Sequence, residues 1–187
     1  LLCKQGVRGS IPRSSTNYQM YTLPSAISLI GMAGAGKTSV GHALANKINY
    51  KFIDSDKVIE NRYKISLQAL LESRGYLKLR KIEEKEILGL PIDDTVISTG
   101  GSVVYGSDGM NFLKENSTIV YLEINLEQIF ERNINFLNRG FAKHPEHSIE
   151  EVFTERTQLY KKYADITVTN NAGIDDCVEL IINCFNQ

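Results

Sequence analysis

The sequence has no surplus of charge of either sign. Its 187 residues contain 21 Lys and Arg against 22 Asp and Glu, a formal net charge of −1. Proteins that bind nucleic acid or anionic membrane surfaces usually concentrate positive charge, because phosphates dominate those affinities. The sequence also has no run of about 18 consecutive apolar residues, the length that a membrane-spanning helix needs. We therefore expect no nucleic-acid partner and no membrane partner, and small molecules are the more natural ligands.

Cysteine is scarce as well. The three cysteines, Cys3, Cys177 and Cys184, are an odd number at a spacing that fits neither a disulfide framework nor a zinc site. A reducing compartment is the simpler expectation, and we predict the cytoplasm. Cys177 and Cys184 lie seven residues apart in a helix-like segment, so both should face the core from one side of that helix.

The start of the chain has no acidic residue: no Asp or Glu occurs before Asp54. Residues 1–25 contain Lys4, Arg8, Arg13 and several serines, without hydrophobic periodicity. Such a segment fits an organelle transit peptide, for example to a plastid, but equally a disordered extension or translated upstream sequence. We expect residues 26–187 to form one domain, because this length buries a full α/β core without disulfides or metals.

One glycine-rich stretch stands out against this background. Residues 31–38 (GMAGAGKT) fit G-x-x-x-x-G-K-[ST], with an apolar run before them and a helix-like segment after them, and this context predicts a phosphate-binding loop. In such a loop, backbone N–H groups converge on phosphate oxygens at the positive end of the following helix. Lys37 then reaches the terminal phosphates, and Thr38 offers its hydroxyl to Mg²⁺. The predicted nucleotide-binding residues are Gly34, Ala35, Gly36, Lys37, Thr38 and Ser39.

Short β-rich runs alternate with helical patterns, which is typical of a parallel sheet with helices on both faces. We expect strands at 27–30, 51–54, 95–98, 118–123 and 166–169. Helices are expected as a pair at 55–73 and 75–88, and at 37–48, 108–116, 126–137, 149–163 and 174–185. The predicted fold class is α/β: a three-layer doubly wound domain with a five-stranded parallel sheet, a P-loop and a mobile lid. The lid is the polar segment 138–147, which lacks periodicity and ends at a capping box, 148–151.

Two carboxylates, Asp54 and Asp56, follow the second predicted strand. In an extended stretch, side chains two residues apart point the same way. Near a triphosphate, one carboxylate can hold Mg²⁺ through water while the next receives a substrate hydroxyl. The sequence leaves a plainer alternative open, in which one of them only caps the helix that begins near Lys57.

Several other polar positions have both a functional and a plain interpretation. Arg80 and Glu83 are three residues apart on a predicted helix, within reach of each other, and could equally be an exposed ion pair. The sequence TGGS at 99–102 follows the third predicted strand, where paired glycines admit a ligand to the backbone or simply form a turn. Arg139 and Arg156, each taken alone, could be surface arginines.

Taken together, these motifs resemble those of the shikimate kinases, in the nucleoside monophosphate kinase-like branch of P-loop proteins. The resemblance extends over residues 26–186. Its parts are the loop 31–38, the D-x-D of Asp54 and Asp56, the G-x-x-x-x-R-x-x-E of Gly75, Arg80 and Glu83, the T-G-G of 99–101, and R-x-x-x-Y-x-x-x-A-D at 156–165. Chance does not readily supply five motifs in this order.

The resemblance implies an enzyme that phosphorylates a hydroxyl of shikimate with ATP, giving shikimate 3-phosphate and ADP. Lys37 and the loop amides would hold the ATP phosphates, while Thr38 and, through water, Asp54 would hold Mg²⁺. Asp56 would bind and orient the attacking hydroxyl and could accept its proton. The predicted catalytic residues are Lys37, Asp56 and Arg139.

The resemblance also implies how the acceptor is bound. Arg80 and Arg156 would grip the carboxylate, which guanidinium groups match bidentately. Gly100 and Gly101 would approach the acceptor through the backbone. Arg139 would swing in with the lid, contact ATP and neutralise charge on the transferred phosphoryl group.

This sequence departs from the family pattern at five positions. The family usually has an acidic residue after the glycine of the third motif, an aromatic before its arginine, a third glycine after T-G-G, and proline both after the lid arginine and in the last motif. Here these positions hold Tyr76, Leu79, Ser102, Gly140 and Gln158. We expect glycine in place of the lid proline to loosen the loop.

Two alternatives to a shikimate kinase stay open. One is a kinase for another small hydroxy acid such as gluconate, because two arginines suit any anionic acceptor. The other is a nucleotide-binding regulatory protein without turnover, which the altered lid and Tyr76 would favour. A nucleoside monophosphate kinase fits less well, because a carboxylate pair and a double glycine suit a polyol acid better than a nucleobase. We expect a monomer.

Overall fold

A computed structural model of the protein describes residues 23–132, 140–171 and 173–186. Arg139, one of the predicted catalytic residues, lies outside these ranges. So do Cys3 and nearly all of the predicted leader, so their expected roles stay predictions.

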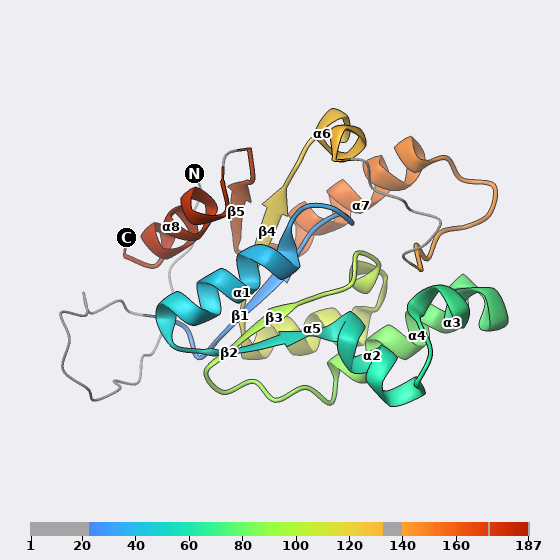
Figure 1. Cartoon of the computed structure of the whole chain (residues 1–187), viewed down its shortest axis with the longest axis horizontal. Coiled ribbons are helices and arrows are strands. Elements are labelled where there is room, and N and C mark those ends of the chain that lie inside the picture. The colour runs from blue at the N-terminus through green and yellow to red at the C-terminus, as the bar shows by residue number, and fades with distance from the viewer. Residues whose placement is uncertain (1–22, 133–139, 172, 187) are drawn as a thin grey trace.

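A five-stranded parallel sheet forms the centre of the fold (Figure 1). Its order is β2-β3-β1-β4-β5. The strands are β1 (Ala26–Ile30), β2 (Lys51–Asp54), β3 (Thr95–Ser98), β4 (Thr118–Glu123) and β5 (Ile166–Thr169). All five were predicted, and only β1 differs, since it begins one residue earlier. The predicted α/β fold class with a doubly wound sheet is thus confirmed.

Burial explains why these runs form strands. Every residue of β1 and β3 is buried, as expected for central strands of a sheet that is covered on both faces. The polar Ser28 is tolerated inside β1 because its hydroxyl lies 2.7 Å from the Ser117 hydroxyl. At the edge, β5 alternates buried and exposed residues.

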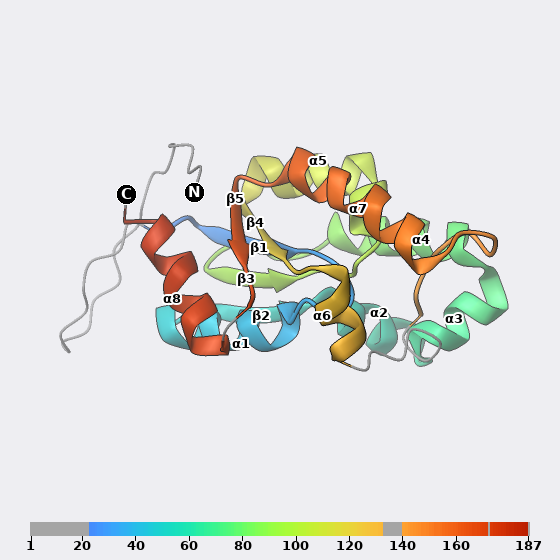
Figure 2. The ribbon, with the colours of Figure 1, turned by 90° about the horizontal axis from the view of Figure 1, so that it is seen from above.

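Helices cover both faces of this sheet (Figure 2). On one side lie α1 and α8, and on the other α5 and α7, which gives three layers. The helices are α1 (Lys37–Ile48), α2 (Ser55–Tyr63), α3 (Leu67–Arg74), α4 (Tyr76–Ile87), α5 (Ser107–Asn116), α6 (Leu126–Glu131), α7 (Ile149–Tyr163) and α8 (Ile174–Cys184), with a 3₁₀ helix, η1 (Val103–Tyr105).

Three details correct the predicted helices. The helix predicted at 126–137 ends at Glu131 in α6, and residues 133–137 lie outside the described ranges. The segment 55–73 forms two helices, because Lys64 ends α2 with a left-handed backbone and Ser66 caps α3. The short helix η1 was not predicted. By contrast, the capping box at Ser148 and Glu151 is confirmed, since both of its hydrogen bonds are present.

Helices α2, α3 and α4 form a lobe beyond the carboxyl end of β2 (Figure 1). The lobe has its own apolar cluster of Ile59, Leu67, Leu70, Leu79, Ile82 and Ala142. Leu79, which replaces the aromatic residue usual in the family, is fully buried there. Ala142 comes from the predicted lid, so this segment joins the lobe to the rest of the domain.

Two further findings concern the described part of the chain. None of its helices has both the length and the apolar character needed to cross a bilayer. Cys177 and Cys184 are both buried on the inner side of α8, as predicted. Burial raises the pKa of the Cys177 thiol to about 11, so it stays protonated and behaves as a small apolar group.

Candidate active site

The phosphate-binding loop joins β1 to α1 and depends on three glycines. Gly31, Gly34 and Gly36 have φ angles of 147°, 85° and 88°, which L side chains rarely adopt. Gly36 precedes the first turn of α1 and provides no side-chain cap. The N–H groups at the start of α1 therefore point into the site without a side-chain partner from the cap, as an anion site requires.

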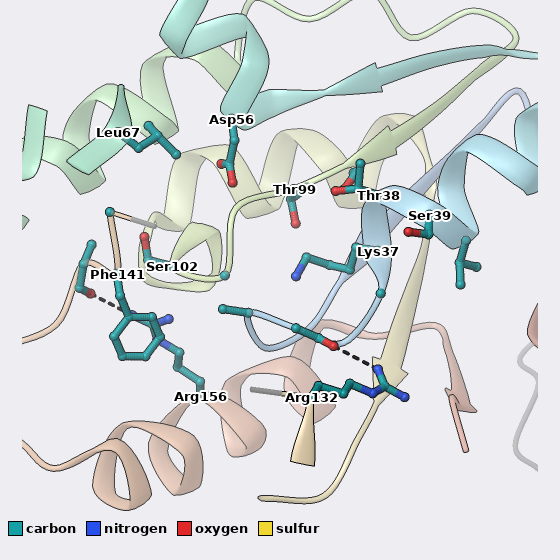
Figure 3. A pocket seen from close by; sticks show the side chains of 18 of the residues that line it. Lys37, Thr38, Ser39, Asp56, Leu67, Thr99, Ser102, Arg132, Phe141 and Arg156 are labelled. Atoms are coloured by element: carbon teal, nitrogen blue, oxygen red, sulfur yellow. Dashed lines mark hydrogen bonds between the residues drawn. The ribbon is translucent and has the colours of Figure 1, made fainter. Parts of the chain in front are cut away.

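The Lys37 side chain lies across this loop. Its ammonium donates hydrogen bonds to the carbonyl oxygens of Gly31 at 2.8 Å and Met32 at 2.9 Å, and the residue is buried. Figure 3 shows the side chains of Lys37, at the start of α1, and Asp56, in α2, pointing into the same pocket. A positive charge therefore lies between the loop and the predicted acceptor side of the site.

Asp54 caps α2, the plainer of the two roles that the sequence left open, and it also contacts Thr38. One carboxylate oxygen accepts hydrogen bonds from the backbone N–H groups of Asp56 at 3.0 Å and Lys57 at 3.3 Å, which caps α2. The other accepts from the Thr38 hydroxyl at 2.8 Å. The two residues predicted to hold Mg²⁺ are thus already in contact, with Ser98 close by at 3.5 Å from the Thr38 hydroxyl.

Asp56 carries an unsatisfied carboxylate. Its Oδ1 atom is buried and has no hydrogen-bond partner among the described residues. Burial, followed by the charges of Glu83 and Asp54, raises the pKa of Asp56 to about 7, while Lys37 acts to lower it. A carboxyl group poised near neutral pH, with a free oxygen in a cleft, is suited to orient a hydroxyl and accept its proton.

Glu83 lies beside Asp56 but does not pair with Arg80, contrary to one reading of the sequence. It is buried, burial raises its pKa, and it accepts a hydrogen bond from the Ser102 hydroxyl. Ser102 stands where the family usually has a third glycine, so this contact depends on one of the departures. Gly100 lies against both carboxylates, and its N–H donates to the Ser55 hydroxyl at 3.0 Å.

We expect Gly100→Ala to lower turnover by about tenfold, because overpacking costs about 1–3 kcal/mol and displaces what it touches. A Cβ at Gly100 would lie 2.7 Å from Glu83 Oε1 and 2.8 Å from Asp56 Oδ1. Steady-state kcat checks this, with Gly89→Ala as the matched control because its Cβ would meet only one atom, at 3.7 Å. Equal kcat for both variants would contradict the assigned place of Asp56.

The two predicted acceptor arginines meet at one carbonyl oxygen. Arg156 Nη2 donates to the Ala142 oxygen at 2.7 Å, and Arg80 Nη2 donates to the same atom at 3.2 Å. Arg156 is only 1% exposed. Neither guanidinium forms an ion pair within the described part of the chain, and the Nε atoms of both are buried without a partner. Two neighbouring cations with unused donors are suited to bind an anion.

These groups surround one cavity of about 590 Å³, which is in the usual range for small-molecule sites (Figure 3). The predicted residues that line it are Gly34, Gly36, Lys37, Thr38, Ser39, Asp56, Gly101 and Arg156. Ala35, Asp54, Arg80 and Gly100 do not line it, but each contacts or adjoins a residue that does. Arg139 remains outside the described residues.

Other lining residues were not predicted. Arg132 donates to the carbonyl oxygens of Gly34 and Asn170, both at 2.9 Å, and Asn170 donates to the Ala35 oxygen at 2.7 Å. Asn170 directly follows β5, so its place at the sheet edge where ligands collect was an available signal. Arg132 had no such signal. Phe141 and Ala142, which sequence analysis assigned to a polar mobile loop, are instead buried in the cavity wall.

Several known proteins resemble this chain in sequence or in structure. The family model described as shikimate kinase matches residues 33–186. A shikimate kinase from Sulfurihydrogenibium sp. (strain YO3AOP1) is 35% identical over 136 residues, 72% of this chain and 82% of the relative. A shikimate kinase from Haemophilus influenzae is 36% identical over 166 residues, which cover 84% of this chain and 92% of the relative. The solved structure of shikimate kinase from Acinetobacter baumannii in complex with shikimate has a TM-score of 0.77 at 30% identity, covering 87% of this chain and 93% of that one.

Proposed function

This chain belongs to the shikimate kinase family, and we propose that it transfers the γ-phosphoryl group of ATP to a hydroxyl of shikimate, giving shikimate 3-phosphate and ADP. The observation that carries the proposal is the buried, unpartnered oxygen of Asp56, which lines the same cavity as the phosphate-binding loop and Arg156. A regulatory protein without turnover would have no need of such a costly group.

ATP binds on the loop side of the cavity. The N–H groups of the loop and of the first turn of α1 receive the phosphates, with Thr38 and Ser39 at the helix start. Lys37 turns from the carbonyls of Gly31 and Met32 to the terminal phosphates, where its charge opposes theirs. Arg132 borders the same side of the cavity.

Thr38 and Asp54 would hold Mg²⁺, which supplies charge neutralisation at the phosphates when bound. Their hydroxyl and carboxylate oxygens are hard donors of the kind that Mg²⁺ prefers, and they already lie 2.8 Å apart. Within the described ranges there is no cluster of three His, Cys, Asp or Glu residues that could bind a metal alone. A site shared with phosphate oxygens and water is therefore the arrangement that fits.

The acceptor binds between Asp56 and the arginine pair. Arg156 and Arg80 bind its carboxylate through donors left over from their bonds to Ala142. Asp56 binds the attacking hydroxyl and takes its proton as the new oxygen–phosphorus bond forms and the bond from the γ-phosphorus to ADP breaks. Arg139, by the family resemblance, neutralises charge on the transferred group.

The direct test is ADP release from Mg·ATP with and without shikimate, with gluconate in parallel. We expect release to depend on shikimate and not on gluconate. Dependence on gluconate instead would assign another hydroxy acid, and ATP binding without turnover on either acid would favour a regulatory role.

Arg156→Lys should raise the KM for shikimate by about tenfold with a smaller change in kcat, because an ammonium cannot replace a bidentate guanidinium. Arg62→Lys is a matched control, since Arg62 pairs with Glu86 on the lobe and does not line the cavity. Initial rates at varied shikimate measure the effect. An unchanged KM would remove Arg156 from the acceptor site.

We also propose that the enzyme acts as a monomer in the cytoplasm. The large exposed apolar side chains support a monomer, because they are scattered over several elements and form no single patch: Ile65, Leu77, Leu88, Phe130, Ile174 and Leu180. A plastid location remains the alternative if residues 1–25 belong to a transit peptide.

A further inference from the structure

Gly140 occupies a position that only glycine fits. Its φ angle is +61°, in the left-handed region. A Cβ there would lie 2.6 Å from the Cβ of Leu67 and 2.8 Å from its carbonyl carbon, closer than real Cβ contacts allow. Its N–H donates to the Gln68 side-chain oxygen at 3.0 Å. The backbone at Gly140 is therefore held tightly against the start of α3.

The turn at Gly140 determines where the next two residues go. Phe141 and Ala142 are 8% and 2% exposed. The Phe141 ring centroid lies 4.6 Å from the Arg156 guanidinium carbon, and the Ala142 oxygen receives hydrogen bonds from both Arg156 and Arg80. A single backbone carbonyl is thus the shared hydrogen-bond acceptor of two like-charged groups, which also lie over the Tyr105 ring, Arg80 at 3.5 Å and Arg156 at 5.4 Å.

That shared carbonyl decides which donors remain for a ligand. It engages one Nη2 atom of each guanidinium, while the Nε atoms of Arg80 and Arg156 are buried without a partner. Buried guanidinium donors without a partner are costly, so a ligand that satisfies them gains affinity. If the carbonyl moved, the two guanidiniums would lose their shared hydrogen-bond acceptor, and their free donors would no longer converge.

We propose that Gly140 is a positioning residue for the acceptor: its left-handed turn against Leu67 fixes the Ala142 carbonyl, and that carbonyl aligns Arg80 and Arg156 for the acceptor carboxylate. This inference rests on the proposed function, because it requires a carboxylate-bearing acceptor. It also gives a different explanation for glycine at position 140, where the family usually has proline. Glycine here does not simply loosen the loop; it permits a tighter contact than any other residue allows.

Proline cannot take over this role, for three reasons. Its ring fixes φ near −65°, whereas the turn has +61°. It has no N–H for Gln68, and its ring atoms would collide with Leu67. Gly140→Pro, which restores the residue usual in the family, should therefore weaken acceptor binding in this chain.

The test compares Gly140→Pro and Gly140→Ala with the unmodified enzyme and with Gly89→Ala as the matched control. We expect KM for shikimate to rise by about tenfold or more in both Gly140 variants, as expected when two charge-assisted hydrogen bonds are misaligned. KM for ATP should stay within about twofold, a separation that general unfolding would not produce. Gln68→Ala keeps the glycine and removes the hydrogen bond to Gly140, together with an exposed one to Glu72 at 2.8 Å. It should raise KM for shikimate by a smaller factor, about twofold to threefold.

The outcomes separate this inference from the proposed function. If the unmodified enzyme phosphorylates shikimate and the Gly140 variants keep or lower its KM, Gly140 does not position the acceptor and the inference is wrong. A parallel rise in both KM values would also overturn it, in favour of a purely structural role. If the Gly140 variants fail to fold, Gln68→Ala decides, and an unchanged KM for shikimate rejects the inference. Absence of shikimate turnover in the unmodified enzyme would overturn both proposals.

Discussion

Asp56→Asn should lower kcat for shikimate phosphorylation by about 10²- to 10⁴-fold, the usual contribution of a positioned general base. Asparagine keeps the size of the side chain but can no longer accept the proton of the attacking hydroxyl. ATP binding should stay within about twofold, because the nucleotide contacts come from the loop and not from α2. Single-turnover phosphate transfer and ATP titration measure the two effects separately.

The matched control is Asp108→Asn, an exposed aspartate in the first turn of α5. It should leave kcat unchanged. A kcat for Asp56→Asn within a few-fold of the unmodified enzyme would show that Asp56 does not take the proton. Loss of ATP binding in the same variant would show that the nucleotide and acceptor sides of the cavity had been assigned wrongly.

The same substitution should stabilise the ligand-free protein as pH rises. The pKa of Asp56 is raised from 3.8 to about 7 on folding, so the unfolded chain loses the proton first and stability falls as pH rises through that interval. Asparagine removes this loss. Between pH 5 and pH 8 the advantage of Asp56→Asn should grow by about 2–3 kcal/mol, because the slope of about 1.4 kcal/mol per pH unit flattens as the pH passes the folded pKa. Denaturant unfolding at pH 5 and pH 8 tests this, and a constant difference would contradict the raised pKa.

The parts of the site that could be predicted are those whose residues are close together in the sequence or directly follow a strand. The loop from Gly31 to Thr38 is contiguous, and its conformation follows from its own glycines. Asp54 and Asp56 follow a strand, so topology alone carries them to the ligand edge of the sheet. For the same reason all five strands and the order of layers could be predicted.

The remainder depends on contacts between distant segments. Helical spacing predicted that Arg80 and Glu83 could pair, but Ser102 binds Glu83, and Ala142 accepts from Arg80. Arg132, directly after α6, donates a hydrogen bond to Gly34, which lies 98 residues earlier in the sequence. A local sequence pattern cannot predict such a contact. At Gly140, the local rule that glycine loosens a loop is overruled by its packing against Leu67.

Lys37→Met should lower kcat by about 10²- to 10³-fold, the usual cost of removing one preorganised donor at a developing charge. The unbranched methionine side chain keeps the apolar stem of lysine and removes only the ammonium. ATP affinity should fall by a smaller factor, about tenfold, because the loop amides still bind the phosphates. Lys51→Met, at an exposed position of β2, is the control and should change neither quantity.

The Lys37 substitution should also change Asp56. Lys37 is the cation that acts to lower the pKa of Asp56, against the effects of burial, Glu83 and Asp54. Without it, Asp56 should hold its proton to higher pH, so the residual kcat of Lys37→Met should require a more alkaline solution than that of the unmodified enzyme. Rates measured from pH 6 to pH 9 test this shift. If the profile keeps its position while kcat falls, Lys37 acts on the phosphates alone, and the proton acceptor is controlled from the acceptor side of the cavity.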